Sequence, residues 1–385
     1  MLSRPIALLT IAIAVVGANS MVLAPITGAV SLDLGGTPAE MMQAAAAYGV
    51  TTAISAIFLA PRADVIGAHR ALHQAVLVLM VSMIASVLAW NKWALIGAQG
   101  LGGIGAGMAI PAIYALAPQL GPKGQEKKSM GLVLSGWTLA LVGGVAGSGF
   151  LAEWAGWRAV YAILFIAICV VFVGMRVVDL TVEVKSRKAT TPLTALQVPG
   201  IFRGLLTAFL FMLGFYGTFG FIGAHVHDAL ERGTDGAGII TLFYGVGFGV
   251  GTFFDRYVDR LEQRHAGMVS FACLAVTYIA FFMVSLQFAL FCIVAFVWGI
   301  VQHLGLNFVV SRLSALDVTQ RGAILGLNSA VTYIAVSGGA LAFRPVYEAG
   351  GLGLVNVIST FCVTVAFVES LTAPKETIRS APSDA

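Results

Sequence analysis

Charged residues are scarce in this sequence. Asp, Glu, Lys and Arg make up 10% of its 385 residues, whereas 58% are hydrophobic and the mean hydropathy is +0.91. Soluble domains carry about 25% charged residues, so this chain lacks the charges to cover a surface that faces water. Apolar runs of about 20 residues, the length that spans a bilayer, recur along nearly the whole chain. The sequence therefore predicts an all-α integral membrane protein.

Residues that usually carry chemistry are also few. The four cysteines lie in apolar runs, without the spacing of a disulfide framework or a CxxC metal site. The six histidines are scattered, no phosphate-binding loop is present, and no acidic residue falls at the middle of a predicted span. We therefore expect no enzymatic activity, no metal and no cofactor. Because the basic residues lie in short loops, we expect no nucleic-acid partner either.

The apolar runs divide the chain into twelve predicted spans. They lie at 5–27, 41–61, 72–90, 94–117, 129–151, 158–178, 201–224, 236–254, 266–286, 288–311, 321–344 and 352–371. We predict an N-terminal six-helix bundle at 1–178, a polar linker at 179–200, a C-terminal six-helix bundle at 201–371 and a polar tail at 372–385.

Lys and Arg positions predict the orientation, because these residues concentrate in cytoplasmic loops. With a cytoplasmic N-terminus, 18 of the 22 lie on the cytoplasmic side. The exceptions are Lys92, Arg158, Arg232 and Arg344. We expect a multi-pass protein of the cell membrane, a bacterial inner membrane, with both termini in the cytoplasm.

The two halves of the chain repeat each other at an offset of 195 residues. Gly143-Gly144 corresponds to Gly338-Gly339, Glu153 to Glu348, and Gly156 to Gly351, while Asp64 corresponds to Asp259. Parallel repeats of six helices are typical of one large class of transporters, in which the substrate binds between the halves near the membrane midplane. The repeat therefore predicts two pseudo-symmetric bundles around a shared site.

Loop residues carry a resemblance to a known family. Asp64, Gly67 and Arg70 follow the second span, and the second half has Asp259, Arg260 and Arg264 in the equivalent loop. Together with the segment from Gly144 to Gly156-Trp157-Arg158, this pattern resembles the major facilitator superfamily over essentially the whole chain. The closest likeness is to its twelve-span drug:proton antiporter and sugar-efflux branch. The resemblance implies alternating access, export, and a conformational switch at these loop residues.

Polar residues inside the predicted spans are the candidate substrate-binding residues, since such groups are costly in lipid. Most are neutral, and several are aromatic. The candidates are Asn19, Tyr48, Thr52, Trp137, Thr138, Tyr216, Tyr244, Trp298, Gln302, His303, Asn307, Asn328, Thr332 and Tyr333. For each one, the alternative is a hydrogen bond that only holds helices together. His303 is the best-placed candidate proton carrier, because an unperturbed histidine titrates near pH 6.5.

The sequence thus favours a monomeric secondary active transporter. It would export a small molecule (a drug, a sugar or a metabolite), with proton antiport as the possible coupling. An uncoupled facilitator remains an alternative. A non-transporting receptor or scaffold is disfavoured, because the chain has no large soluble domain or long signalling tail.

Overall fold

The fold consists of membrane-length helices. The computed structural model describes residues 3–122, 124–182, 192–255, 262–317 and 319–372, and within these ranges every regular element is helical. Eleven helices are long and apolar enough to cross a membrane. The last of them contains two spans, because Gly350 and Gly351 leave the helical conformation in its middle. The predicted all-α architecture with twelve spans is therefore confirmed.

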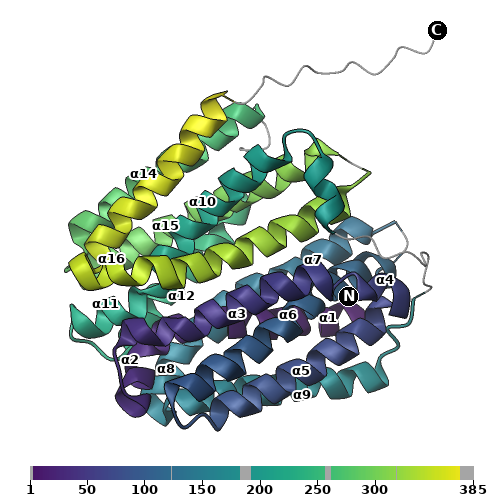
Figure 1. Cartoon of the computed structure of the whole chain (residues 1–385), viewed down its shortest axis with the longest axis horizontal. Helices are drawn as coiled ribbons and strands as arrows, with labels where there is room; N and C mark the ends of the chain where they lie inside the picture. The colour runs from purple at the N-terminus through teal and green to yellow at the C-terminus, as the bar shows by residue number, and fades with distance from the viewer. Residues whose placement is uncertain (1–2, 123, 183–191, 256–261, 318, 373–385) are drawn as a thin grey trace.

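The first half supplies six spans, drawn in purple to blue in Figure 1. Two of these spans are interrupted: α1 and α2 make the first, while α7, the π-helical η1 and α8 make the fifth. The elements are α1 (Arg4–Met21), α2 (Leu23–Leu34), α3 (Pro38–Phe58), the short α4 (Arg62–Ile66), α5 (Ala68–Val87), α6 (Lys92–Leu120), α7 (Glu126–Leu139), η1 (Ala140–Val145), α8 (Ala146–Ala155) and α9 (Trp157–Val177).

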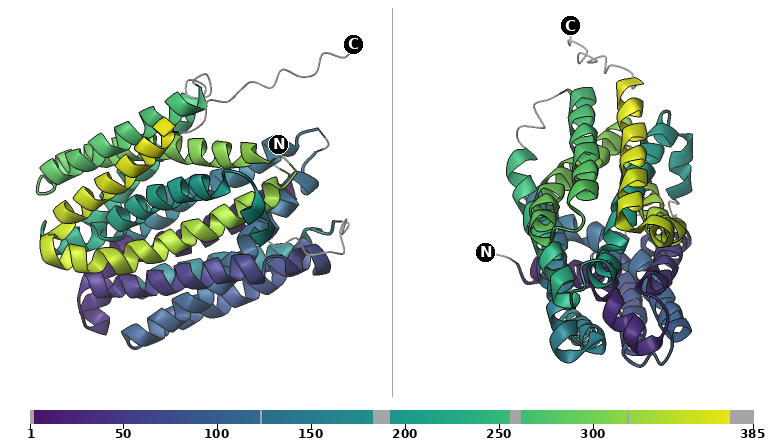
Figure 2. Two further views of the ribbon diagram at one scale, coloured as in Figure 1. Left: turned by 45° about the horizontal axis from the view of Figure 1, so that its top comes forward. Right: turned by 90° about the vertical axis from the view of Figure 1, so that its left-hand side faces the viewer.

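The second half lies beside the first and is drawn in teal to yellow (Figures 1 and 2). Its elements are η2 (Pro192–Gln197), α10 (Ile201–Gly220), α11 (Ile222–Asp228), α12 (Thr234–Gly251), η3 (Thr252–Phe254), α14 (Gln263–Val284), α15 (Phe288–Leu316) and α16 (Arg321–Thr372). The predicted linker and tail lie largely outside the described residues, so the division into domains stays a prediction.

Local sequence explains where several helices begin and break. Thr37 and Glu40 form a capping box at the start of α3, which satisfies two otherwise free backbone amides. Pro25 has no amide to donate to the carbonyl one turn earlier, and the first span breaks nearby at Val22. We call the side of the molecule where α1 begins and α16 ends the proximal side, and the opposite side the distal side.

The sequence repeat is visible in the backbone. Gly156 ends the fifth span with φ +82°, and Gly351 separates the eleventh and twelfth spans with φ +62°. Both lie on the distal side. Only glycine adopts positive φ without strain, so the same tight turn accounts for a glycine at corresponding positions in the two halves.

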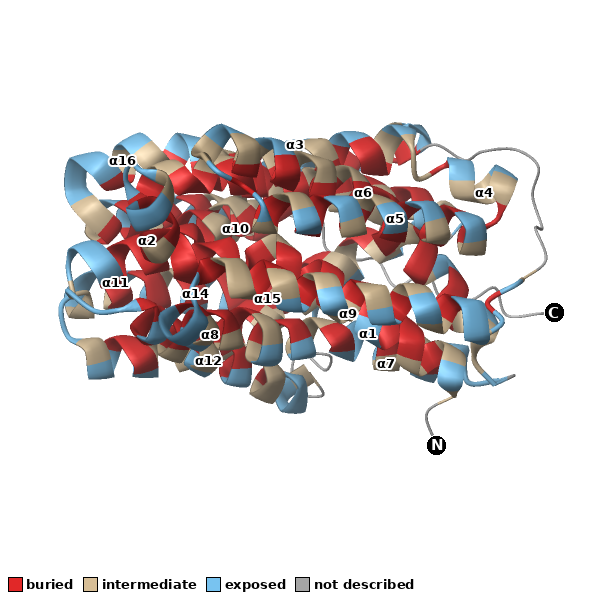
Figure 3. Ribbon diagram, turned by 90° about the horizontal axis from the view of Figure 1, so that it is seen from below, coloured by how far each residue is buried: buried red, intermediate tan, exposed pale blue. Residues whose placement is uncertain are grey.

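The outward helix faces are apolar. Figure 3 shows buried residues on the inward faces of the helices and exposed ones on the outward faces. On α9 the exposed residues include Ile163, Ile166, Val170 and Val173, each more than half exposed. So much exposed apolar surface is stable only in lipid.

A carboxylate that is 12% exposed ties three helices of the second half together on the proximal side. Glu369 of α16 accepts two hydrogen bonds from Arg312 of α15, at 2.5 and 2.8 Å, and one from Thr207 of α10, at 2.9 Å. Arg203 of α10 adds a fourth, at 3.1 Å. Paired charges are the form in which charge is tolerated inside a helix bundle.

We predict that Glu369→Ala destabilises the second half strongly, because it leaves the largely buried Arg312 guanidinium without its carboxylate. Breaking a buried ion pair costs about 3–5 kcal/mol, so the melting temperature of the detergent-purified protein should fall clearly below that of the wild type. Glu262→Ala is the control, since the Glu262 side chain is 77% exposed. Equal melting temperatures for the two variants would contradict the structural role of Glu369.

Candidate functional site

The two halves touch through close glycine contacts at two helix crossings. Gly149 of α8 lies against Gly238 of α12, so close that a Cβ on either residue would meet the other backbone. Gly49 of α3 lies in the same way against α16, where the Ser337 hydroxyl donates to the Ala46 carbonyl at 2.9 Å. Small residues allow such close approach in lipid, so these crossings bring polar residues of the two halves within reach.

A carboxylate of the first half caps a helix of the second half on the distal side. Glu153 of α8 accepts hydrogen bonds from the Thr234 backbone amide at 2.9 Å and from the Thr234 hydroxyl at 3.0 Å. Thr234 is the first residue of α12, where free amides and the helix dipole favour an anion. Glu153 therefore stabilises the distal contact between α8 and α12.

The other crossing has an ionic contact on the same side. Arg344 of α16 pairs with Glu40 of α3 at 3.2 Å and with Glu348 of its own helix at 2.7 Å. Glu348 corresponds to Glu153 in the repeat, and it holds the Arg344 side chain that reaches Glu40 of the first half. Together the two contacts join the halves on the distal side.

Tyrosines from both halves meet near the centre of this interface. The rings of Tyr48 on α3 and Tyr333 on α16 lie 6.2 Å apart. The Tyr216 side chain of α10 lies near both. Asn19 of α1 lies beside the Tyr48 hydroxyl. The structure thus brings together four of the predicted cavity residues, two from each half.

Trp137 connects this cluster of tyrosines to Tyr114, which the sequence analysis did not select. Its indole N–H donates to the Tyr114 hydroxyl of α6 at 2.8 Å, and Tyr114 lies within electrostatic reach of Tyr333. Tyr114 is an intramembrane tyrosine inside the predicted fourth span, which was the signal available for selecting it.

A small cavity of about 20 Å³ lies between the halves, next to the tyrosines. It has room for about one water molecule, so the site is contracted in this conformation. Residues of α1, α2, α3, α10 and α16 line the cavity, including Ser20, Met42, Tyr216, Phe219 and Val336.

Tyr244 and Trp298 lie within the second half. Their rings are 4.7 Å apart, and both pack against Phe215 and Phe219 of α10. Because Tyr216 lies near Tyr244, this aromatic cluster forms a wall behind the central tyrosines.

His303 and Asn307 lie together at a different place, on the seam between α12 and α15. His303 Nε2 is 3.0 Å from Asp255 Oδ1, and the Asn307 amide donates to the same oxygen at 3.0 Å. The sequence analysis did not select Asp255, because it lies one residue beyond the predicted end of its span. Asp255 follows Gly251 by four residues, and Asp64 follows Ala60 by the same spacing in the first half. This spacing was the signal available for selecting Asp255.

The remaining cavity candidates have different surroundings. Gln302 and Asn328 are buried, and their side-chain oxygens have no hydrogen-bond partner among the described residues. Thr52 donates to the Tyr48 carbonyl of its own helix, as a packing residue does. Thr138 faces Gly249 across the interface, and Thr332 is half-buried on α16.

The predicted switch residues lie on the proximal side. Asp64 is half-buried in α4, and Gly67 joins α4 to α5 with φ +91°, which favours glycine. Arg70 is exposed on the first turn of α5, and Arg264 lies in the first turn of α14. Asp259 and Arg260 lie outside the described residues, so the switch remains a prediction.

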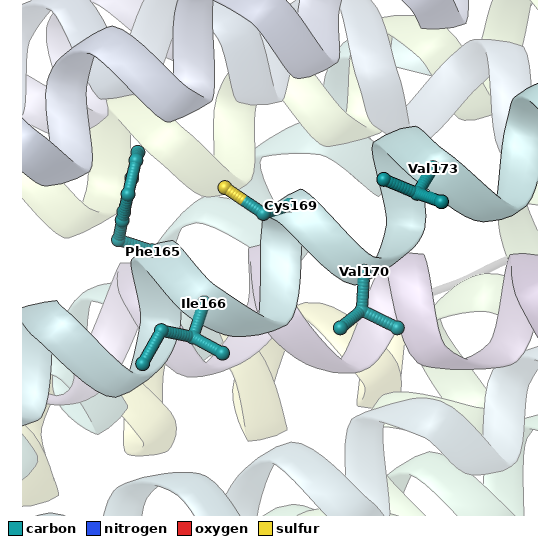
Figure 4. Close-up of a pocket in the computed structure, with 5 residues that line it drawn as sticks. All are labelled: Phe165, Ile166, Cys169, Val170 and Val173. Atoms are coloured by element: carbon teal, nitrogen blue, oxygen red, sulfur yellow. The ribbon is translucent and has the colours of Figure 1, made fainter.

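A larger hollow, of about 320 Å³, lies on the outside of the molecule. Phe165, Ile166, Cys169, Val170 and Val173 line it, all from α9 (Figure 4). Because these side chains are apolar or weakly polar and belong to the lipid-facing surface, we do not assign the hollow to substrate binding.

Comparisons with known proteins agree with this architecture. The family model described as Major Facilitator Superfamily matches residues 9–340. The uncharacterized MFS-type transporter YwfA of Bacillus subtilis (strain 168) is 25% identical over 377 residues, which cover 96% of this chain and 91% of YwfA. A probable sugar efflux transporter of Pasteurella multocida (strain Pm70) is 25% identical, covering 72% of this chain and 69% of its own. The purine ribonucleoside efflux pump NepI of Salmonella paratyphi B is 23% identical, covering 57% of each chain.

One solved structure shares the fold over nearly the full length. The crystal structure of D-xylose-proton symporter superposes with a TM-score of 0.78, covering 97% of this chain and 98% of that one. The sequence identity is 15%, so this likeness concerns the fold alone.

We predict that Glu153→Ala loosens the distal side, because it removes the cap on α12. Losing a helix cap costs about 1 kcal/mol, so a cysteine introduced for Ser20 at the central cavity should react about fivefold faster with a thiol reagent added from the distal side. The measurement uses a background in which the four native cysteines are replaced. Trp154→Ala is the control, since Trp154 is 87% exposed; identical labelling rates would argue against the cap as a closing contact.

Proposed function

Because this chain belongs to the major facilitator superfamily, we propose that it exports a small uncharged polar molecule by alternating access between two helix bundles. The observation that carries this proposal is the meeting of Tyr48 and Asn19 from one half with Tyr216 and Tyr333 from the other. A site divided between the halves is exposed to one side or the other as the halves rock. The glycine crossings supply contacts about which they can rock.

We propose that the proximal side of the protein faces the cytoplasm of a bacterial cell. This orientation rests on the 18 Lys and Arg residues assigned to that side. The contacts of Glu153 with Thr234 and of Arg344 with Glu40 join the halves on the distal side. On this assignment, the conformation described here is closed toward the outside.

The chemistry of the site supports an uncharged substrate. The groups at the centre are phenol hydroxyls, amides and an indole, which hydrogen-bond and stack but carry no charge. A cation would need a buried carboxylate beside it, and the carboxylates of Glu40, Glu153 and Glu369 are engaged elsewhere. The relatives named for efflux of sugars and of purine ribonucleosides fit this class, since both are uncharged polar molecules.

We predict that Tyr48→Phe and Tyr333→Phe each lower the export rate about tenfold while leaving expression unchanged, because each removes one hydroxyl from the site. The measurement is accumulation of radiolabelled inosine, D-xylose and chloramphenicol in a strain without the native gene, complemented with each variant. Tyr161→Phe is the matched control, since the Tyr161 hydroxyl lies in the first half without a hydrogen-bond partner among the described residues. Export of a permanently charged cation and of none of the three probes would contradict an uncharged substrate.

The energy source in this proposal is proton antiport, with an uncoupled facilitator as the competing possibility. Purified protein in proteoliposomes distinguishes them. An antiporter concentrates a transported probe when a pH gradient is imposed, whereas a facilitator only exchanges it in counterflow. Counterflow that does not respond to the gradient would refute coupling without refuting transport.

We predict that Asp64→Asn slows transport by about tenfold without lowering expression. The carboxylate can accept amide hydrogen bonds at a neighbouring helix terminus when the proximal ends close, and the asparagine lacks its charge. The rate is measured as probe exchange in proteoliposomes, and Asp179→Asn serves as a control on the same side. An unchanged rate would leave Asp64 as a loop residue that only sets topology.

A further inference from the structure

A histidine–carboxylate pair occupies the seam between α12 and α15. His303 Nε2 lies 3.0 and 3.2 Å from the two oxygens of Asp255, and the side chains are 16% and 30% exposed. Gly251 contacts the His303 side chain, and the Phe248 ring lies edge-on to the imidazole at 5.0 Å. Because Asn307 also donates to Asp255, the carboxylate is held in place by two side chains of α15.

The other imidazole nitrogen is the feature that packing does not explain. His303 Nδ1 is buried and has no hydrogen-bond partner among the described residues. With the Nε2 proton donated to Asp255, a second proton would be added at Nδ1. The imidazolium would then carry a charge directly opposite the carboxylate, which strengthens the hydrogen bond.

Few other charged groups lie on the helices packed around this pair. Arg312 of α15 is engaged by Glu369 of α16, together with Arg203 of α10. On α14 the charged groups are at the proximal end, where Glu262 pairs with His265 at 3.3 Å on the exposed surface, beside Arg264. Among the described residues, Asp255 is the group that responds directly to the charge on His303.

A chain of aromatic contacts connects the pair to the proposed substrate site. The Phe248 ring lies 6.2 Å from Tyr244, which lies 4.7 Å from Trp298. Tyr244 is in turn within electrostatic reach of Tyr216. A shift of α12 against α15 at His303 would therefore also shift the wall behind the central tyrosines.

We infer that His303 and Asp255 together form the proton-binding site through which transport is coupled; this inference rests on the proposed function. A proton bound at Nδ1 strengthens the contact between α15 and Asp255, which follows η3 at the end of the α12 span. Coupling requires this contact to weaken when the distal side opens, so that protonation favours the conformation described here. An exporter requires that protonation favour the conformation whose distal side is closed. A proton taken up from outside must return the empty carrier to the state that faces the cytoplasm.

The test measures the distal opening as a function of pH, with no transported probe. Spin labels replace Leu32 of α2 and Leu286, which precedes α15; both are exposed residues near the distal ends of opposite halves. In protein whose native cysteines are replaced, we expect the long-distance population to rise about tenfold between pH 5.5 and pH 8. His303→Gln should abolish this response, since glutamine hydrogen-bonds but does not titrate.

Two further variants separate the pair from general effects of pH. His265→Gln removes an exposed histidine of α14 and should leave the response intact. Asp255→Asn keeps the imidazole and removes the opposing charge, so a proton on His303 would meet no carboxylate and the pH response should become clearly smaller. This variant also serves as the test if His303→Gln does not fold.

Each outcome decides the inference. A pH response that persists in His303→Gln, or that keeps its full size in Asp255→Asn, overturns the pair as the proton site. A wild-type protein whose distances do not change with pH overturns it as well. Failure of the proposed function looks different, because wild-type protein would then show no export and no counterflow of the uncharged probes.

Discussion

Contact between the two halves depends on glycine at the helix crossings. Lipid is as apolar as a leucine side chain, so helices in a bilayer gain little from burying apolar surface against each other. Gly149 and Gly238, like Gly49 opposite Ser337, let the backbones approach closely enough for dispersion contacts and interhelical hydrogen bonds to replace that driving force. Bulkier residues at these positions would separate the halves, and the central tyrosines would no longer meet.

The distribution of charge follows from the same solvent. Each described carboxylate near a helix contact is engaged: Asp33 with Arg158, Glu40 with Arg344, Glu153 with the start of α12, and Glu369 with Arg312. These contacts lie near the two ends of the molecule. The centre is left to hydroxyl, amide and indole groups, which can be buried without a counter-charge.

Much of this fold could be predicted from the sequence, because hydrophobic length is a strong signal in membrane proteins. The break at Gly350-Gly351 falls between the predicted spans 321–344 and 352–371, and the positive φ of Gly156 and Gly351 matches the repeat. Side-chain neighbours were harder to predict. In helices that are apolar all round, periodicity does not indicate which face is inward, so Tyr114 was missed. Asp255 was missed because span ends are uncertain by a few residues, and one residue decided whether it counted as loop or membrane.

The position of the His303–Asp255 pair restricts how a proton and a substrate could influence each other. The pair lies within one half, between α12 and α15, whereas the tyrosine site lies between the halves. A proton and a substrate would therefore not compete for the same atoms, and one could not simply displace the other. Coupling would instead require that both favour different arrangements of the same helices, because a ligand shifts an equilibrium only by its difference in affinity for the two states. The span of α12 and η3 meets this requirement, since Asp255 directly follows η3, Tyr244 lies in the middle of α12 and Glu153 caps its start.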